Sequence, residues 1–437
     1  MGELFCEIKN YREAVSFLYE QLPMFTRIGE KAYKKDLDNI IILCERLSNP
    51  HQKFKSIHIA GTNGKGSTSH MLAAILQSAG YKTGLYTSPH LFDFRERIRI
   101  NGEMISEQEV VDFMHKVLPL DISPSFFEFT VAMAFDHFAM HRVDFAVIET
   151  GLGGRLDSTN IIDPEISVIT NIGWDHMNML GNSLSEIASE KAGIIKKNKP
   201  VIIGQVSDET LPVFRKKAEK MSSTLLLAED TFSVLESITK DDRIISNFLN
   251  NESGEEQEVI TGSVGLYQIA NTRTVLTAVK AFREAGYSLD DSSVKQGLID
   301  FVSLTGLRGR WEIISHGPDI IADVAHNKDG IILVLEQLRK QYPEANVHFI
   351  LGFVKDKDIE EILKLFPKNA AYYFTNAHLP RALPHHELME KAAASQLQGN
   401  SFDDVNDALV AAKSRAEKND VIMICGSFFI LSELNSR

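Results

Sequence analysis

The stretch SIHIAGTNGKGST, residues 56–68, runs from a short apolar segment into a glycine-rich turn that carries one lysine. Apolar residues at helical spacing follow at once, so the stretch predicts a strand, a loop and a helix N-terminus in series. Backbone N–H groups of such a loop point inward, and the helix dipole adds partial positive charge. Lys65 can reach a β- or γ-phosphate, and the hydroxyl of Ser67 or Thr68 can bind Mg²⁺. The stretch therefore predicts a binding site for a nucleoside triphosphate.

The same stretch departs from the strict phosphate-loop pattern at two positions. Ile59 stands where the pattern has its first glycine, and Gly66 separates Lys65 from Ser67. An ordinary glycine-rich turn between a strand and a helix is the alternative interpretation. Glycine, lysine and hydroxyl residues together at one strand–helix junction favour the phosphate-binding interpretation.

The size and charge of the chain limit its class. A length of 437 residues exceeds what one hydrophobic core usually serves, so we expect two domains. The net charge of -13 argues against a general affinity for nucleic acid or anionic membranes. The N-terminal residues carry charges where a signal peptide needs an apolar core, and no apolar run approaches the roughly 18 residues of a membrane span. Three cysteines lie far apart without metal-ligand spacing, so we expect reduced thiols in a cytoplasmic protein: Cys6, Cys44 and Cys425.

Strand and helix patterns alternate along the N-terminal part of the chain, which predicts parallel strands covered by helices on both faces. The expected strands are 57–60, 83–87, 145–149, 168–172 and 201–204, and the expected helices include 127–141, 184–194 and 271–285. Residues 205–262 are less regular, and their segment 247–262 is typical of a polar hairpin or loop.

A second alternation follows a segment, 300–309, that mixes serine, threonine and glycine and suggests a domain junction. Its expected elements are a helix at 331–342 and strands at 320–324, 347–351, 371–374 and 421–424. The sequence therefore predicts an α/β protein. An N-terminal phosphate-loop ATPase domain with a mostly parallel sheet spans residues 1–302, and a smaller Rossmann-like α/β domain spans residues 303–437.

Ligands of parallel sheets collect at the C-terminal ends of strands, and polar residues follow several predicted strands. Ser88 has its hydroxyl at such an end, although a simple turn explains it as well. Glu149 ends an apolar strand, as a Walker B carboxylate that binds Mg²⁺ does. The glycines that follow it let a ligand approach the backbone, or form a hairpin capped by Asp157. His176 is either a metal or phosphate neighbour or a structural hydrogen-bonding group.

Other polar residues have plain structural alternatives. Lys191 lies late in a predicted helix, where a charge on an exposed face or near the helix C-cap is the plain interpretation. Asp323 and His326 follow a strand of the second alternation, and Ser427 follows its last strand, so all three point toward a crevice. Asn327 and Ser427 are equally well placed to cap helices.

Taken together, the blocks GTNGKGS, TSPHL, ETGLGGRLDSTN, DHMNMLG, EKAGI, DVAHN and KDKD resemble those of the folylpolyglutamate synthase/dihydrofolate synthase family of Mur-ligase-like amide ligases. The resemblance covers nearly the whole chain. It implies a ligase that uses ATP and Mg²⁺ to phosphorylate a substrate carboxylate, after which the amine of L-glutamate attacks the acyl phosphate. Such a site must position reactants and neutralise charge.

Matching motifs imply roles for single residues. The triphosphate is implied to lie on Gly61, Thr62, Asn63, Gly64, Lys65, Gly66 and Ser67, with Asn271, Arg310 and Asp323 also contacting nucleotide. The implied Mg²⁺ ligands are Ser88, Glu149 and His176, and Lys191 matches a lysine that is carbamylated in the family. His326 and Ser427 match glutamate positions, and the pterin end is implied near Phe127, Leu156, Asp157 and residues 22–25. Lys65, Lys191, Asp323 and His326 are the implied catalytic residues.

The resemblance implies L-glutamate and dihydropteroate or folate as substrates, and we expect a bifunctional, monomeric enzyme without nucleic-acid or membrane partners. A ligase of cell-wall synthesis is one alternative. It predicts an additional N-terminal domain of about 100 residues, whereas the phosphate loop here begins at Gly61. A P-loop ATPase or GTPase switch is the other, and it predicts hydrolysis without added substrates.

Overall fold

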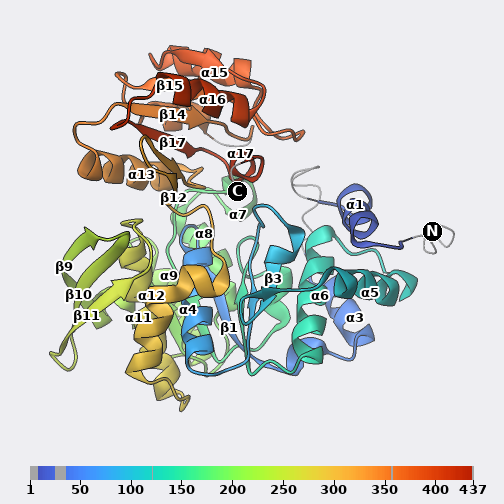
Figure 1. Cartoon of the computed structure of the whole chain (residues 1–437). Coiled ribbons are helices and arrows are strands. Elements are labelled where there is room, and N and C mark those ends of the chain that lie inside the picture. The colour runs from blue at the N-terminus through green and yellow to red at the C-terminus, as the bar shows by residue number, and fades with distance from the viewer. Residues whose placement is uncertain (1–7, 25–35, 121, 356–357, 436–437) are drawn as a thin grey trace. The chain divides into compact units, whose positions relative to one another are not determined.

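The computed structural model describes residues 8–24, 36–120, 122–355 and 358–435. The chain divides into two compact units, Met1–Leu307 and Arg308–Arg437 (Figure 1). Cys6, Phe25 and two residues of the KDKD block, Asp356 and Lys357, lie outside the described residues.

The first unit is built on an eight-stranded sheet with the order β4-β3-β2-β5-β1-β6-β7-β8. Its strands are β1 (Lys55–Ala60), β2 (Thr83–Tyr86), β3 (Ile98–Ile100), β4 (Glu103–Met104), β5 (Phe145–Glu149), β6 (Ile166–Ile169), β7 (Val201–Ile203) and β8 (Leu225–Leu227). Six neighbouring strands, from β2 to β8 in that order, pair in parallel, and β3 and β4 add an antiparallel edge. The predicted mostly parallel sheet is confirmed.

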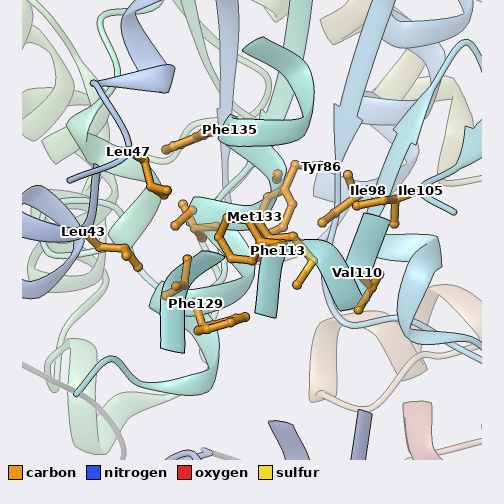
Figure 2. Close-up of a cluster of buried hydrophobic side chains, with 14 of the residues drawn as sticks. Leu43, Leu47, Tyr86, Ile98, Ile105, Val110, Phe113, Phe129, Met133 and Phe135 are labelled. Carbon is orange, nitrogen blue, oxygen red and sulfur yellow. The ribbon is translucent and has the colours of Figure 1, made fainter. Parts of the chain in front are cut away.

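Helices cover both faces of this sheet, as continuous apolar strands require. Side chains of β5 alternate between the faces. Ala146 and Ile148 pack in the cluster shown in Figure 2, with α1 (Tyr11–Gln21), α3 (Asp38–Arg46), α5 (Glu107–Val117) and α6 (Phe126–Met140). Phe145 and Val147 pack on the other face, with α4 (Lys65–Ser78), α11 (Gln268–Glu284) and α12 (Asp291–Thr305). A third cluster joins β6 and β7 to α8 (Leu184–Lys191) and α9 (Leu211–Met221).

Several predicted boundaries are shifted. The strands predicted to end at 87, 172 and 204 end at Tyr86, Ile169 and Ile203, because the polar and glycine residues that follow form loops. The helix α12 reaches Thr305, inside the segment 300–309 expected to join the domains. Gly297 lets α12 pack closely on α4, since a Cβ atom there would lie 2.6 Å from the Cα atom of Ile75.

The hairpin predicted at 247–262 is formed by β10 (Arg243–Asn250) and β11 (Glu256–Thr261), which pair with β9 (Phe232–Lys240) in an antiparallel sheet. Short elements complete the unit: α7 (Met177–Leu180), α10 (Ala228–Thr231), and 3₁₀ turns at Pro50–Gln52, Phe94–Arg97, Leu118–Leu120, Ser158–Ile161 and Ala192–Ile194. Across the part of the chain that the structure describes, no helix has the length and apolar character needed to cross a membrane.

The second unit has a six-stranded sheet with the order β12-β13-β17-β14-β15-β16. The strands are β12 (Glu312–Ser315), β13 (Asp319–Ala322), β14 (Val347–Leu351), β15 (Ala371–Phe374), β16 (Gly399–Ser401) and β17 (Val421–Cys425). All pairs are parallel except β12 with β13. The helices are α13 (Lys328–Gln341), α14 (Ile359–Leu363), α15 (His385–Ala394), α16 (Val405–Arg415) and α17 (Phe428–Ser432). This α/β unit agrees with the predicted second alternation.

Candidate active site

The glycine-rich loop connects β1 to the N-terminus of α4, as the sequence predicts. Gly64 stands at the N-cap with a φ of 82°, so it offers the helix no capping side chain. A Cβ atom at Gly61 would lie 1.9 Å from Thr170 Oγ1, and one at Gly64 would lie 2.4 Å from Asn271 Oδ1. Only glycine fits both positions without rearrangement. The first N–H groups of α4 therefore face the loop, where an anion can satisfy them.

The loop after β6 braces the phosphate loop. The N–H of Asn63 donates to Asn171 Oδ1 at 2.9 Å, and the Thr170 hydroxyl donates to the carbonyl oxygen of Asn63 at 2.5 Å. The N–H of Gly173 donates to Thr62 Oγ1 at 2.9 Å. These bonds hold the loop in one conformation before a ligand binds, which lowers the entropy lost on binding.

Two lysines converge on the carbonyl oxygen of Gly61. Lys65 Nζ donates to it at 3.1 Å, and to the carbonyl oxygen of Thr62 at 3.2 Å. Lys191 Nζ, from the end of α8, donates to the same Gly61 oxygen at 2.8 Å. Burial, followed by the charge of Lys65, lowers the pKa of Lys191 to about 7. Of the two plain interpretations of Lys191, the exposed charge is wrong, because its side chain is buried beside the loop. The position near a C-cap is confirmed, because Lys191 is the last residue of α8 and Ala192 is the cap.

The three predicted metal ligands lie at or beyond the C-terminal ends of β2, β5 and β6, of which β2 and β5 are neighbours and β1 separates β5 from β6. The N–H of Ser88 donates to Glu149 Oε2 at 3.3 Å, because β2 and β5 are neighbours in the sheet. Glu149 is buried. His176 follows β6 with a φ of 52°, and its N–H donates to Asp175 Oδ1 at 2.9 Å. A hydroxyl, a carboxylate and an imidazole at one sheet edge form a donor set that suits a hard divalent cation held with water and phosphate oxygens.

The glycine segment after β5 is held by Asp157. Asp157 Oδ2 accepts from the N–H groups of Gly151 and Leu152, both at 2.8 Å. Its Oδ1 accepts from the N–H of Thr159 at 3.0 Å and from the Thr159 hydroxyl. The predicted capped turn is therefore present. Phe127 lies against this turn, since a Cβ atom at Gly151 would come within 2.5 Å of its ring. Leu156, in the same turn, is half-buried.

Gln268 is a site residue that the sequence reasoning missed. Asn271 Nδ2 donates to Gln268 Oε1 at 2.8 Å, and Gln268 Nε2 donates to Ser67 Oγ at 3.1 Å. Gln268 is fully buried. The pair links the start of α11 to the phosphate loop and orients the Ser67 hydroxyl. A single glutamine at the start of a helix carries no motif by which sequence alone could find it.

In the second unit, two neighbouring strand ends bring polar residues together, because β13 pairs with β17. Asp323 follows β13, and its carboxylate accepts from the N–H groups of Trp311 and Ala325, both at 2.8 Å. The His326 Nδ1 atom lies 2.9 Å from the carbonyl oxygen of Val324. A carbonyl oxygen can only accept, so Nδ1 carries a proton in this contact.

The capping alternatives for this edge are confirmed. Asn327 Oδ1 accepts from the N–H of Gly330 at 2.9 Å and starts α13. Ser427 Oγ accepts from the N–H of Phe429 at 3.1 Å and starts α17. Arg310 places its guanidinium 5.4 Å from the ring centroid of Phe428. The structure thus divides the predicted site residues between the units: Arg310, Asp323, His326 and Ser427 lie in the second, and the others lie in the first.

Two family models match the chain. The Mur ligase middle domain matches residues 59–279, and the Mur ligase glutamate ligase domain matches residues 309–428. A dihydrofolate synthase/folylpolyglutamate synthase of Bacillus subtilis is 32% identical over 98% of this chain and 99% of the relative. A folylpolyglutamate synthase of Lacticaseibacillus casei is 30% identical over 97% of each chain.

Solved structures share the fold over nearly the same length. Escherichia coli FolC in complex with DHPP and ADP superposes with a TM-score of 0.84 at 28% identity, covering 97% of this chain and 96% of that one. A Yersinia pestis bifunctional folylpolyglutamate synthase/dihydrofolate synthase complexed with AMPPNP and a Mn ion has a TM-score of 0.82 at 28% identity, covering 97% of each chain.

Proposed function

The chain belongs to the dihydrofolate synthase/folylpolyglutamate synthase family of Mur ligases, and we propose that it joins L-glutamate to a pteroate or folate carboxylate in a reaction driven by ATP. The observation that carries the proposal is the phosphate loop itself. Gly64 opens α4 without a cap, and Lys65 and Lys191 converge on Gly61 beside it. This arrangement concentrates positive charge and N–H donors where a triphosphate would be activated.

The proposed chemistry answers a specific difficulty. A carboxylate is a poor electrophile, so an oxygen of the acceptor carboxylate first attacks the γ-phosphorus of ATP and ADP leaves. The neutral amine of glutamate then attacks the acyl carbon, and phosphate leaves with the former carboxylate oxygen. The amine loses a proton as the amide forms. The site must hold the reactants in line and neutralise the charge that moves between them.

We assign nucleotide binding to the loop residues Gly61–Ser67. Lys65 of this loop would contact the β- and γ-phosphates, and Asn271 would lie beside the nucleotide. Support comes from Asn271 Oδ1, which occupies the space that a side chain at Gly64 would need. In the second unit, Arg310 and Asp323 would contact the nucleotide, and His326 and Ser427 would bind glutamate.

Mg²⁺ would be held by Ser88, Glu149 and His176. When bound, the ion neutralises phosphate charge and fixes the orientation of the phosphate oxygens. The hydrogen bond from the N–H of Ser88 to Glu149 supports the assignment, because it brings the hydroxyl-bearing residue against the carboxylate. The Mn ion in the Yersinia pestis relative also supports a divalent cation.

Lys191 would react with CO₂ to form a carbamate. Carbamylation needs a neutral amine, and burial holds the pKa of Lys191 at about 7, so a large fraction of the amine is neutral at physiological pH. The modified side chain would carry a negative charge, which the nearby Lys65 or a bound metal ion would balance.

The acceptor would bind at the glycine turn after β5. Phe127 would stack on the flat pterin ring, with Leu156 beside it and Asp157 holding the turn. We propose that the enzyme both forms the first glutamate amide of dihydropteroate and extends folates. The Bacillus subtilis and Escherichia coli relatives support this choice, because each is called a dihydrofolate synthase/folylpolyglutamate synthase.

Isotope transfer tests the acyl phosphate. Dihydropteroate labelled with ¹⁸O in its carboxylate is incubated with the enzyme, MgATP and L-glutamate, and the released phosphate is analysed by mass spectrometry. The proposal predicts one labelled oxygen in each phosphate released. Unlabelled phosphate with an equal yield of amide would show that the carboxylate is activated by another route.

A further inference from the structure

Three side chains that the ligase chemistry does not use meet between α5 and α6. Glu109 lies in the first turn of α5, His137 lies in the last turn of α6, and His141 follows that helix directly. The two histidines are four residues apart, so they share one face of the helix. One potential ligand atom from each of the three residues lies within 4.8 Å of the other two.

The spacing of these atoms suits one metal ion. Glu109 Oε1 lies 2.6 Å from His141 Nε2 and 3.4 Å from His137 Nδ1, and the two ring centroids are 4.5 Å apart. Zinc binds histidine nitrogen and carboxylate oxygen at about 2.0–2.2 Å, so tetrahedral ligand atoms lie roughly 3.3 Å from one another. Small side-chain movements would therefore place all three atoms around one ion.

The surrounding contacts hold this cluster in position. The backbone N–H and hydroxyl of Ser106 donate to Glu109 Oε2 at 3.0 and 2.6 Å, which leaves Oε1 directed at the histidines. Orientation of a ligand by a second hydrogen bond is typical of metal sites. The helices are fixed against each other by the Phe113–Phe129 ring contact, visible in the core of Figure 2, and by an ion pair of 2.7 Å between Lys116 and Asp136.

The three side chains differ in exposure, so the proposed site has one buried ligand and two ligands that solvent can reach. The His137 side chain is 7% exposed, whereas Glu109 and His141 are 27% and 39% exposed. An ion could therefore enter from solvent and keep water in its remaining position.

We propose that Glu109, His137 and His141 form a binding site for one first-row divalent cation, of which Zn²⁺ is the reference, distinct from the Mg²⁺ site of the ligase. Two imidazoles and a carboxylate suit zinc and its neighbours better than Mg²⁺. The site is remote from Glu149, because α6 leads into the opposite end of β5, a strand roughly 13 Å long. A bound ion would tie the start of α5 to the end of α6.

Zinc titration of the full chain tests this site. Protein stripped with a chelator is titrated with Zn²⁺ against a chromophoric competitor, in excess Mg²⁺ to saturate hard-ligand sites. The proposal predicts one tight Zn²⁺ per wild-type chain, with affinity at least roughly 100-fold weaker in His141→Ala and in Glu109→Gln. Glutamine at position 109 can still accept the capping bonds from Ser106, so its effect reports the lost carboxylate.

A matched control is His378→Ala, which removes one member of an exposed histidine–carboxylate pair, His378 with Glu433 at 2.8 Å. This control should titrate like the wild type. Co²⁺ provides a second readout, since its visible spectrum should show imidazole and carboxylate ligation only when all three residues are present. The proposal is overturned if wild type, His141→Ala and Glu109→Gln bind Zn²⁺ alike and give the same Co²⁺ spectrum.

Discussion

Lys191 Nζ donates a 2.8 Å hydrogen bond to the carbonyl oxygen of Gly61, which joins the end of α8 to the first residue of the phosphate loop. Lys65, which is half-buried, shares that oxygen at 3.1 Å, so a second ammonium group lies close to that of the buried Lys191. Such a pair is unfavourable unless an anion, a carbamate or a lost proton relieves it. The two lysines therefore favour the binding of an anion, and a triphosphate is such an anion.

The burial of Lys191 predicts a pH-dependent stability. Its pKa falls from 10.5 to about 7 on folding, so between these values the unfolded chain binds more protons than the folded chain. The free energy of unfolding should therefore rise with pH across this window, by on the order of a few kcal/mol. Lys191→Met should lose this rise. Urea unfolding at pH 7 and 10 in CO₂-free buffer measures it, with exposed Lys197→Met as the control. Equal pH dependence in wild type and Lys191→Met would contradict the account.

Lys65→Ala should abolish turnover while the fold remains. Its ammonium is one of the few groups in the loop that can stabilise the negative charge of the phosphate during transfer. Without it, kcat should fall roughly 10²–10³-fold or more. Circular dichroism should be unchanged, because the side chain bonds only loop carbonyls among the contacts described. Lys53→Ala, at an exposed position, serves as the control. Near-normal kcat in Lys65→Ala would remove this lysine from the chemistry.

Asp157→Asn should loosen the glycine turn. In the wild type, one carboxylate oxygen of Asp157 accepts from the N–H groups of Gly151 and Leu152, and the other accepts from the N–H of Thr159. Asparagine replaces one of these oxygens with an N–H₂ group, which cannot accept a hydrogen bond from an N–H donor. Such a mismatch costs about 1–3 kcal/mol of stability. The KM for the acceptor should rise more than the KM for ATP, since the turn lies against Phe127. Steady-state kinetics would measure both KM values, with the exposed Asp208→Asn variant as the control. Equal rises in the two KM values would count against an acceptor site at this turn.

Gly297→Ala should destabilise the first unit. The new methyl group would lie 2.6 Å from the Cα atom of Ile75, and α4 cannot give way there without moving the phosphate loop. Overpacking costs typically about 1–3 kcal/mol, of which the better helix propensity of alanine returns less than about 1. Thermal unfolding should show a lower Tm, whereas exposed Ser292→Ala on the same helix should change little. A Tm at or above that of wild type would show that the helices can separate.

Local patterns predicted the elements of the fold well. The loop from Gly61 to Ser67 and the polar strand ends at Glu149 and Asp323 follow directly from short motifs, because each motif creates its own local structure. The helix α12 was missed: the serine, threonine and glycine residues of 300–309 indicated a domain junction, whereas the helix runs on to Thr305 and packs against α4.

Non-local neighbours explain what the sequence could not show. Lys191 lies beside Gly61 only because β1, β6 and β7 are adjacent in the sheet and α8 packs over them. Gln268 reaches Ser67 from 201 residues along the chain. The cluster of Glu109, His137 and His141 depends on two helices packing across a shared core, so only His137 and His141 share a spacing that the sequence displays.

The central claim is that ATP is consumed only to join glutamate to an acceptor. A coupled assay of ADP release with MgATP and L-glutamate compares 7,8-dihydropteroate, tetrahydrofolate and no acceptor. The account predicts release with either acceptor, none without acceptor, and none when glutamate is omitted. Equal ADP release without any acceptor would contradict the ligase assignment and identify the chain as an ATPase.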